Sequence, residues 1–171
     1  MWNGANDMFN IGDLIIYSGH GICQIDDICE KTFYDETKKY YVLHPVNDKR
    51  LTISTPVDNQ SVQMFDLIHK DEAKRIFDSF KIEGVSWIEK DHERAQKYQQ
   101  MVYSGDRKEI SKVVNTLMRR ENELHEKDKK LGAQDRKLLA TTQGTLFHEL
   151  ALSVNKSYEE VFEKITHIIQ S

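Results

Sequence analysis

The spacing of the apolar residues changes near Lys70, and this change limits the possible folds most strongly. Before it, short β-branched and aromatic runs such as Leu14–Tyr17 alternate with turn residues. After it, apolar residues recur at helical spacing, beginning with Ala73, Ile76 and Phe77. The pattern predicts an α+β chain with a small β module followed by an all-α bundle. A length of 171 residues suits one compact domain or two small ones.

The segment Phe9–Ile25, with the sequence FNIGDLIIYSGHGICQI, predicts two strands joined by a tight turn. Leu14–Tyr17 and Ile22–Ile25 are the strand-like runs. Between them, Gly19 and Gly21 can adopt a positive φ without steric cost. A strongly bent ribbon of this kind is typical of small barrels of the SH3 or Tudor type. Such barrels bind more often than they catalyse.

Three further short strands are predicted before residue 69, at Tyr40–Leu43, Leu51–Thr55 and Val62–Met64. Five strands in this length would form a five-stranded Tudor/SH3-like half-barrel over residues 9–68, preceded by an N-terminal extension at residues 1–8. Residues 69–171 are expected to form a bundle of four to five helices.

Capping signals divide the helical part of the chain. A first short helix is expected from Lys70 and another after the break at Leu131–Ala133. Three further helices are expected to begin at capping residues followed three positions later by Glu, namely Ser86 with Glu89, Asp106 with Glu109, and Ser157 with Glu160. The helix that starts at Ser86 should run to about Tyr103.

The net charge of −4 is unevenly distributed. Residues 1–70 contain six Lys/Arg and ten Asp/Glu, whereas residues 71–171 contain eighteen of each. Within Arg107–Lys137 ten basic residues face six acidic ones, a local charge of +4. This distribution fits a protein that touches a protein partner with one part and a polyanion with the other. A solvated helix face with many ion pairs explains the helical charges equally well.

No motif in the chain provides a credible active site. His148–Leu152 begins like the zinc-protease motif, but Leu152 occupies the place of the second histidine. His20 and Cys23 would point to opposite faces of a regular strand. Cys23 and Cys29 are expected to be ordinary thiols, not a disulfide or a zinc site. We therefore expect no enzyme activity, cofactor, metal or small-molecule substrate.

The chain also lacks the signals of membrane insertion and secretion. It contains no run of apolar residues long enough to span a bilayer. Residues 1–8 lack the basic and apolar regions of a signal peptide. A cytoplasmic protein without a membrane partner is therefore expected.

Several segments together resemble the CarD/CdnL family of bacterial RNA polymerase-binding transcription regulators. The opening segment at Phe9–Ile25 is similar to the family's F-x-x-G-D-x-V-V-Y-P-x-H-G-x-G-x-I. The barrel motif alone also occurs in the transcription-repair coupling factor, but this chain has no room for that protein's helicase. The remaining similar segments, in the family's order, are Tyr40–Leu43 with Thr55–Asn59, Ser104–Asp106 with Lys112–Glu121, and Asp135–Leu139 with His148–Ser153.

The resemblance implies that the barrel docks on the β subunit of bacterial RNA polymerase and that the helical module meets promoter DNA at the upstream edge of the melted bubble. Such a tether would stabilise the open promoter complex even with weak DNA affinity. The polymerase face is expected at the barrel edge, with the candidates Lys31, Tyr40, Tyr41, Val42, Leu43, Lys49, Arg50 and Ser54. The DNA-binding candidates are Trp87, Arg94, Lys97, Arg119, Arg120, Arg136 and Lys137.

Two positions depart from the family pattern. Many members carry a Trp, ahead of the Ser-Gly-Asp turn, that wedges into the minor groove. That position is Asp91 here, and Trp87 lies one helical turn earlier. Trp87 either takes the wedge role or packs as a hydrophobic staple in the core. The second departure is Ser54, where members often have an Arg that contacts polymerase; Lys31, Lys49 and Arg50 are candidate substitutes.

Two other functions stay open at this point. The first is a protein–protein adaptor that keeps the polymerase contact and has lost DNA binding, consistent with Asp91 at the usual Trp position. The second is a metal- or thiol-dependent enzyme that uses His20 and Cys23.

Overall fold

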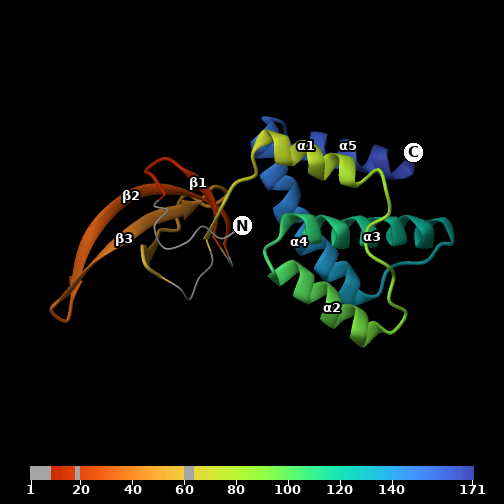
Figure 1. Ribbon diagram of the computed structural model, residues 1–171, viewed down its shortest axis with the longest axis horizontal. Helices are drawn as coiled ribbons and strands as arrows, with labels where there is room; N and C mark the ends of the chain where they lie inside the picture. Colours follow the sequence, from red (N-terminus) through yellow and green to blue (C-terminus); the bar gives the residue numbers. More distant parts are fainter. Residues whose placement is uncertain (1–8, 18–19, 60–63) are drawn as a thin grey trace. The chain divides into compact units, whose positions relative to one another are not determined.

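The computed structural model describes residues 9–17, 20–59 and 64–171, and the chain forms two compact units. Residues 1–67 make up the first, which we call the sheet unit, and residues 68–171 make up the second, which we call the helical unit. Strands occur in the first and helices in the second (Figure 1). The α+β class expected from the sequence is confirmed.

The sheet unit is built on one antiparallel sheet with the strand order β4-β3-β2-β1-β5. Alternate residues of its strands point inward, as expected for a sheet with one buried face. Its core consists of Ile15, Tyr17, Cys23, Ile25, Tyr41 and Leu43. The strands are β1 (Leu14–Tyr17), β2 (Gly21–Phe33), β3 (Glu36–Pro45), β4 (Ile53–Pro56) and β5 (Met64–Asp66).

The opening segment closes one end of this core. The Phe9 N–H donates to the Tyr41 hydroxyl at 3.1 Å, and the two rings meet edge to face with their centres 5.9 Å apart. Gly12 has a φ of +91°, which its lack of a Cβ permits, and its N–H donates to the Ile25 carbonyl at 2.7 Å. The Phe and Gly of the opening pattern therefore have structural roles.

The hairpin formed by β2 and β3 is longer than the sequence predicted. The strands continue to Phe33 and Glu36 and are joined by a two-residue turn, Tyr34–Asp35. Both turn residues have positive φ, 48° and 65°. Asp is common in tight turns of this kind, but Tyr34 is unusual there and no Gly follows Asp35, so the pair does not match the usual turn sequences.

Two predicted features of the sheet unit fall partly outside the described residues. The glycine turn was expected to include residue 19, which is not described, whereas Gly21 has a φ of +72°. The fifth strand was expected at residues 62–64, of which the first two are not described; β5 begins at Met64.

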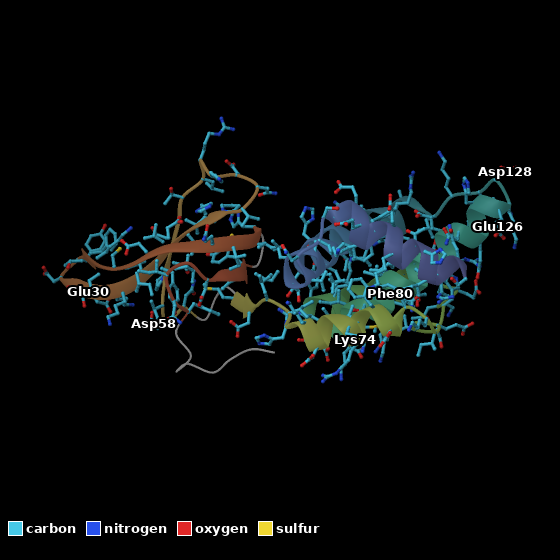
Figure 2. All side chains as sticks on the ribbon, turned by 90° about the horizontal axis from the view of Figure 1, so that it is seen from above. Glu30, Asp58, Lys74, Phe80, Glu126 and Asp128 are labelled. Carbon is cyan, nitrogen blue, oxygen red and sulfur yellow. The ribbon has the colours of Figure 1, made fainter. Side chains whose placement is uncertain are left out.

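The described part of the helical unit contains five helices around one apolar core. Phe80, Tyr98, Leu117 and Phe147 are almost completely buried in that core, and Phe80 is labelled in Figure 2. None of the described helices is both long and apolar enough to cross a membrane. The helices are α1 (Lys70–Ser79), α2 (Asp91–Tyr103), α3 (Arg107–Glu126), α4 (Ala133–Val154) and α5 (Tyr158–Gln170).

Two of the three predicted N-caps are confirmed. The Asp106 side chain accepts from the backbone N–H of Lys108 at the start of α3. Ser157 and Glu160 form a complete capping box at the start of α5. The cap predicted at Ser86 is wrong, because α2 begins at Asp91 and its N-cap makes no side-chain hydrogen bond.

The segment between α1 and α2 is not helical because its carbonyl groups are bonded by side chains of other elements. A Cβ at Gly84 would collide with the Lys112 carbonyl of α3, so the segment lies directly against that helix. From α2, Tyr98 donates to the Ser86 carbonyl and Arg94 to that of Ile88. From α3, Asn115 donates to Ser79 and Ile82, Thr116 to Val85, and Arg119 to Phe80 and Ile82.

A buried carboxylate anchors the first residue of the helical unit. Glu149 of α4 is 4% exposed and accepts from the Ile68 N–H at 3.0 Å. It also forms an ion pair with the Arg107 guanidinium at 2.6 Å. Burial raises the pKa of Glu149 from 4.5 to about 7, although Arg107 acts in the opposite direction.

This pKa predicts a specific pH dependence of stability. Because the pKa of Glu149 is raised on folding, the folded state binds the proton more tightly than the unfolded state does. Its contribution to the free energy of unfolding is fully present below pH 4.5 and is lost as the pH rises through about 7. Glu149→Gln removes the titrating group. We therefore expect this variant to lack a pH-dependent change in the free energy of unfolding that is on the order of 3 kcal/mol in the wild type.

Urea unfolding followed by far-UV circular dichroism, at pH values from about 4.5 to about 8, measures this contribution. The wild type should lose stability relative to Glu149→Gln as the pH rises. Parallel pH profiles for the two proteins would contradict the assignment.

Candidate functional site

Four of the residues expected to contact polymerase lie on one face of the sheet unit. Tyr40 and Val42 of β3 point to this face, whereas the alternate residues Tyr41 and Leu43 point into the core and are 2% and 0% exposed. The register pairs Val42 with Ser54 of the neighbouring strand β4. We call the solvent-facing set Lys31, Tyr40, Val42 and Ser54 the outer-face cluster.

Lys31 joins this cluster from β2, on the other side of β3. Its ammonium lies 5.7 Å from the centre of the Tyr40 ring and donates to the Ser54 hydroxyl at 3.0 Å. The side chain therefore crosses β3 and brings a positive charge to the position of Ser54. Phe33, which is 55% exposed, meets the opposite side of the cluster with its ring centre 6.0 Å from that of Tyr40.

The expectation that Tyr40–Leu43 form a sheet edge is wrong. These residues pair with β2 on one side and β4 on the other, so their backbone groups are used within the sheet. The two edge strands of the sheet are β4 and β5. Lys49 and Arg50 lie in the exposed β3–β4 connection, where the Arg50 side chain is 98% exposed.

The proposed nucleophile pair is not supported by its geometry. Cys23 is completely buried in the sheet core, whereas His20 is exposed. Burial raises the pKa of the Cys23 thiol to about 11, so this thiol is protonated at neutral pH. The described residues include no cluster of His, Cys, Asp or Glu suited to a metal ion.

In the helical unit, Trp87 lies between two arginines. The Arg94 guanidinium is 4.2 Å from the centre of a Trp87 ring, and that of Arg120 is 4.9 Å away. Trp87 itself is half-buried and packs against the core. It precedes α2, so its position is set by these contacts and not by a helical first turn.

Arg94 has a structural role, because its guanidinium is bonded to two carboxylates and to backbone carbonyl groups. It is 5% exposed, and its Nη2 donates to Asp135 of α4 and to Asp91, each at 2.8 Å. Its Nε donates to the other Asp135 oxygen at 3.3 Å, so the pair is bidentate. Asp135 is 6% exposed, whereas the Asp91 side chain is 87% exposed. Because its guanidinium is enclosed, Arg94 does not belong to the exposed basic surface.

The remaining basic candidates differ in exposure. Arg119 is half-buried and donates to Asn115 at 2.7 Å and to carbonyls of the α1–α2 connection. Lys97, Arg136 and Lys137 are exposed. The Arg94–Asp135 ion pair links α2, which carries Lys97, to the N-terminal part of α4, which carries Arg136 and Lys137. We call Trp87, Lys97, Arg120, Arg136 and Lys137 the basic helical surface.

Comparison with known protein families covers both units. The model described as "CarD-like/TRCF RID domain" matches residues 9–68, and the model described as "CarD, C-terminal domain" matches residues 75–166. The second match alone includes more than half of the chain. The chain belongs to the CarD family.

A curated relative supports this membership of the CarD family. The protein named "Putative transcription factor YdeB" from Bacillus subtilis (strain 168) is 28% identical over 148 residues. The matched region includes 84% of this chain and 90% of the relative. The CarD family is a family of transcription factors, so the resemblance inferred from the sequence motifs is confirmed.

The sequence of this CarD-family protein did not reveal the side-chain partners of Arg94 and Arg119. Asp135 was noted only as part of a family motif, and Asn115 was not noted at all. Asn115 lies four residues before Arg119 on α3, and that helical spacing could have indicated the pair. Asp135 has no local signal, because it lies on α4 and Arg94 lies on α2. The spacing of Lys31 and Ser54, 23 residues apart, likewise does not reveal that their side chains meet.

The two acidic partners of Arg94 should differ greatly in importance. Replacing the buried Asp135 by Ala leaves a buried cation poorly compensated, so we expect the free energy of unfolding to fall by about 3 kcal/mol or more. Asp91→Ala removes the exposed partner of the same guanidinium and should cost less than about 1 kcal/mol. Urea unfolding of both variants provides the measurement; equal losses would contradict the structural role given to Asp135.

Proposed function

We propose that this CarD-family protein is a bacterial transcription regulator that binds the RNA polymerase β subunit through its sheet unit and promoter DNA through its helical unit. By holding DNA and polymerase together, it would stabilise the open promoter complex. The sheet unit, in this proposal, is a Tudor-like half-barrel used for docking and not for catalysis. The protein would act in the bacterial cytoplasm. Family membership and the printed name of the Bacillus relative support a role in transcription.

The observation that carries the proposal is the position of the Lys31 ammonium. Family members often have an Arg at the position of Ser54, and the Lys31 ammonium lies 3.0 Å from the Ser54 hydroxyl. A side chain from β2, which lies on the other side of β3, thus supplies the charge that Ser54 lacks. Together with the half-buried Tyr40 and Val42, it forms a mixed apolar and cationic surface suited to a protein partner. Lys49 and Arg50 would contribute at the rim.

The basic helical surface is the proposed DNA contact. Lys97, Arg136 and Lys137 can meet phosphate groups, and each such contact makes affinity depend on salt. Trp87 with Arg120 offers an aromatic and cationic platform beside them. Weak binding at this surface suffices, because attachment to polymerase raises the effective concentration of the DNA.

A specific observation favours a second candidate function, an adaptor that binds polymerase without a DNA wedge. The carboxylate of Asp91 occupies the usual position of the wedge Trp and is 87% exposed. A carboxylate there would repel phosphate groups. Trp87 is meanwhile held at 4.2 Å by the buried Arg94, which limits how far its ring can reach.

Reversing the charge of Lys31 tests the polymerase contact. We expect Lys31→Glu to weaken binding to an isolated β-subunit lobe by about tenfold, equal to about 1.4 kcal/mol, because it removes the cation at Ser54. Lys39→Glu is a matched control, since Lys39 is exposed and lies one position before Tyr40, on the other face of β3. Fluorescence anisotropy with the full chain measures both. Equal losses in the two variants would remove the outer-face cluster from the interface.

The lifetime of the open complex separates the regulator from the adaptor. If Trp87 contacts DNA, Trp87→Ala should shorten the lifetime about tenfold, whereas Trp87→Phe should retain part of the effect because an aromatic ring remains. Binding to the β-subunit lobe and the far-UV circular dichroism spectrum should be unchanged in both variants. A normal lifetime with Trp87→Ala would favour the adaptor.

A further inference from the structure

A groove on the helical unit lies between α1 and α5, and its lining residues belong to neither of the two candidate surfaces described above. The two helices are neighbours in Figure 1, and the groove between them has a volume of about 410 Å³. Its floor is apolar: Phe77 and Val161 are buried, and Val154 and Ile168 are half-buried. No residue of the basic helical surface lines it.

The rim of the groove is strongly basic. It contains five exposed lysines and two exposed acidic residues, Asp78 and Glu160, which leaves a local charge of +3 on a chain whose net charge is −4. The lysines come from α1, α5 and the segments beside them: Lys70, Lys74, Lys81, Lys156 and Lys164. Figure 2 labels Lys74 on α1, at the surface of the helical unit.

The electrostatics of Asp78 report the same positive field. A hydrogen bond and the charge of Lys81, 2.9 Å away, lower the pKa of Asp78, and the charges of Lys74 and Lys164 lower it further. Four of the rim lysines have no ion-pair partner within 4 Å among the described residues. These ammonium groups remain available to an anionic ligand.

Cationic and apolar groups are close together in this groove. The Lys164 ammonium lies 4.2 Å from the centre of the Phe77 ring, so one ligand can touch both. A ligand that matches must present apolar side chains to the floor and carboxylates to the rim. Duplex DNA matches only the rim, because its outer surface presents phosphates and its bases are stacked inside.

We propose that the α1–α5 groove docks an acidic peptide segment of a partner protein, with apolar side chains against Phe77, Val154 and Ile168 and carboxylates against the rim lysines. The argument is charge complementarity combined with an apolar floor of suitable volume. This is a second protein-binding surface, independent of the polymerase and DNA contacts proposed above. Loss of either of those functions would leave it intact.

Binding of the full chain to a synthetic peptide tests the proposal. The probe is a fluorescein-labelled peptide in which Phe and Leu are flanked by glutamates, followed by anisotropy. The Lys74→Glu/Lys164→Glu variant should bind it at least about tenfold more weakly than the wild type. Lys127→Glu/Lys129→Glu is the matched control, because it makes the same change of charge at exposed residues after α3, outside the groove, and should bind as the wild type does.

Two altered peptides and a duplex DNA probe complete the experiment. Replacing Phe and Leu by Ser, or the glutamates by Gln, should each weaken binding, since the proposal requires both the floor and the rim. Equal affinity of the groove variant and its control would overturn the proposal. Binding that tolerates removal of the apolar side chains from the peptide would also overturn it. So would a Lys74→Glu/Lys164→Glu variant that loses duplex DNA binding and keeps peptide binding, a result that would assign the groove to nucleic acid.

Discussion

The helical unit depends on hydrogen bonds that side chains donate to the backbone of the α1–α2 connection. This connection lies against α3 and has few backbone partners of its own, and buried carbonyl groups without partners would be costly. Donors from two helices bond its carbonyls in turn, from Asn115, Thr116 and Arg119 near its start to Tyr98 and Arg94 near its end. Two of these bonds flank Trp87, since the carbonyls of its neighbours Ser86 and Ile88 accept from α2.

This constraint explains why basic residues that look alike in the sequence have different roles. Arg94 and Arg119 hold the connection, whereas Lys97, Arg136 and Lys137 are exposed to solvent. Charge counting alone cannot separate the two groups. The candidate DNA contact is therefore smaller than the local excess of basic residues suggests, because Arg94 is buried and Arg119 is half-buried.

Features with a local physical cause were predictable from the sequence. The caps at Asp106 and Ser157 are examples, because donor and acceptor lie within three residues. The cap at Ser86 has the same pattern, but its carbonyl is bonded by Tyr98 and the local rule fails. The turn at Tyr34–Asp35 was missed because Tyr rarely adopts a positive φ and no Gly follows Asp35, so the usual turn sequence is absent.

The candidate site was less predictable than the fold, because it depends on register and on contacts between elements. Tyr40 and Val42 could be separated from their buried neighbours only once the strand's buried face was known. The role of Lys31 required the order of three strands. Motif resemblance identified the family correctly, but it described an edge where the structure has an interior strand.

The anchoring of Ile68 has a mechanical consequence. The covalent connection from the sheet unit enters the helical unit at this residue, whose N–H is held by the Glu149 carboxylate and, through it, by Arg107 at the start of α3. Any tension along the chain, such as a protein bound at both ends would experience, is thus passed first to the buried hydrogen bond from Ile68 to α4, and then to the ion pair that joins α4 to α3. The joint is stiff on its helical side, and its strength varies with proton concentration near neutrality.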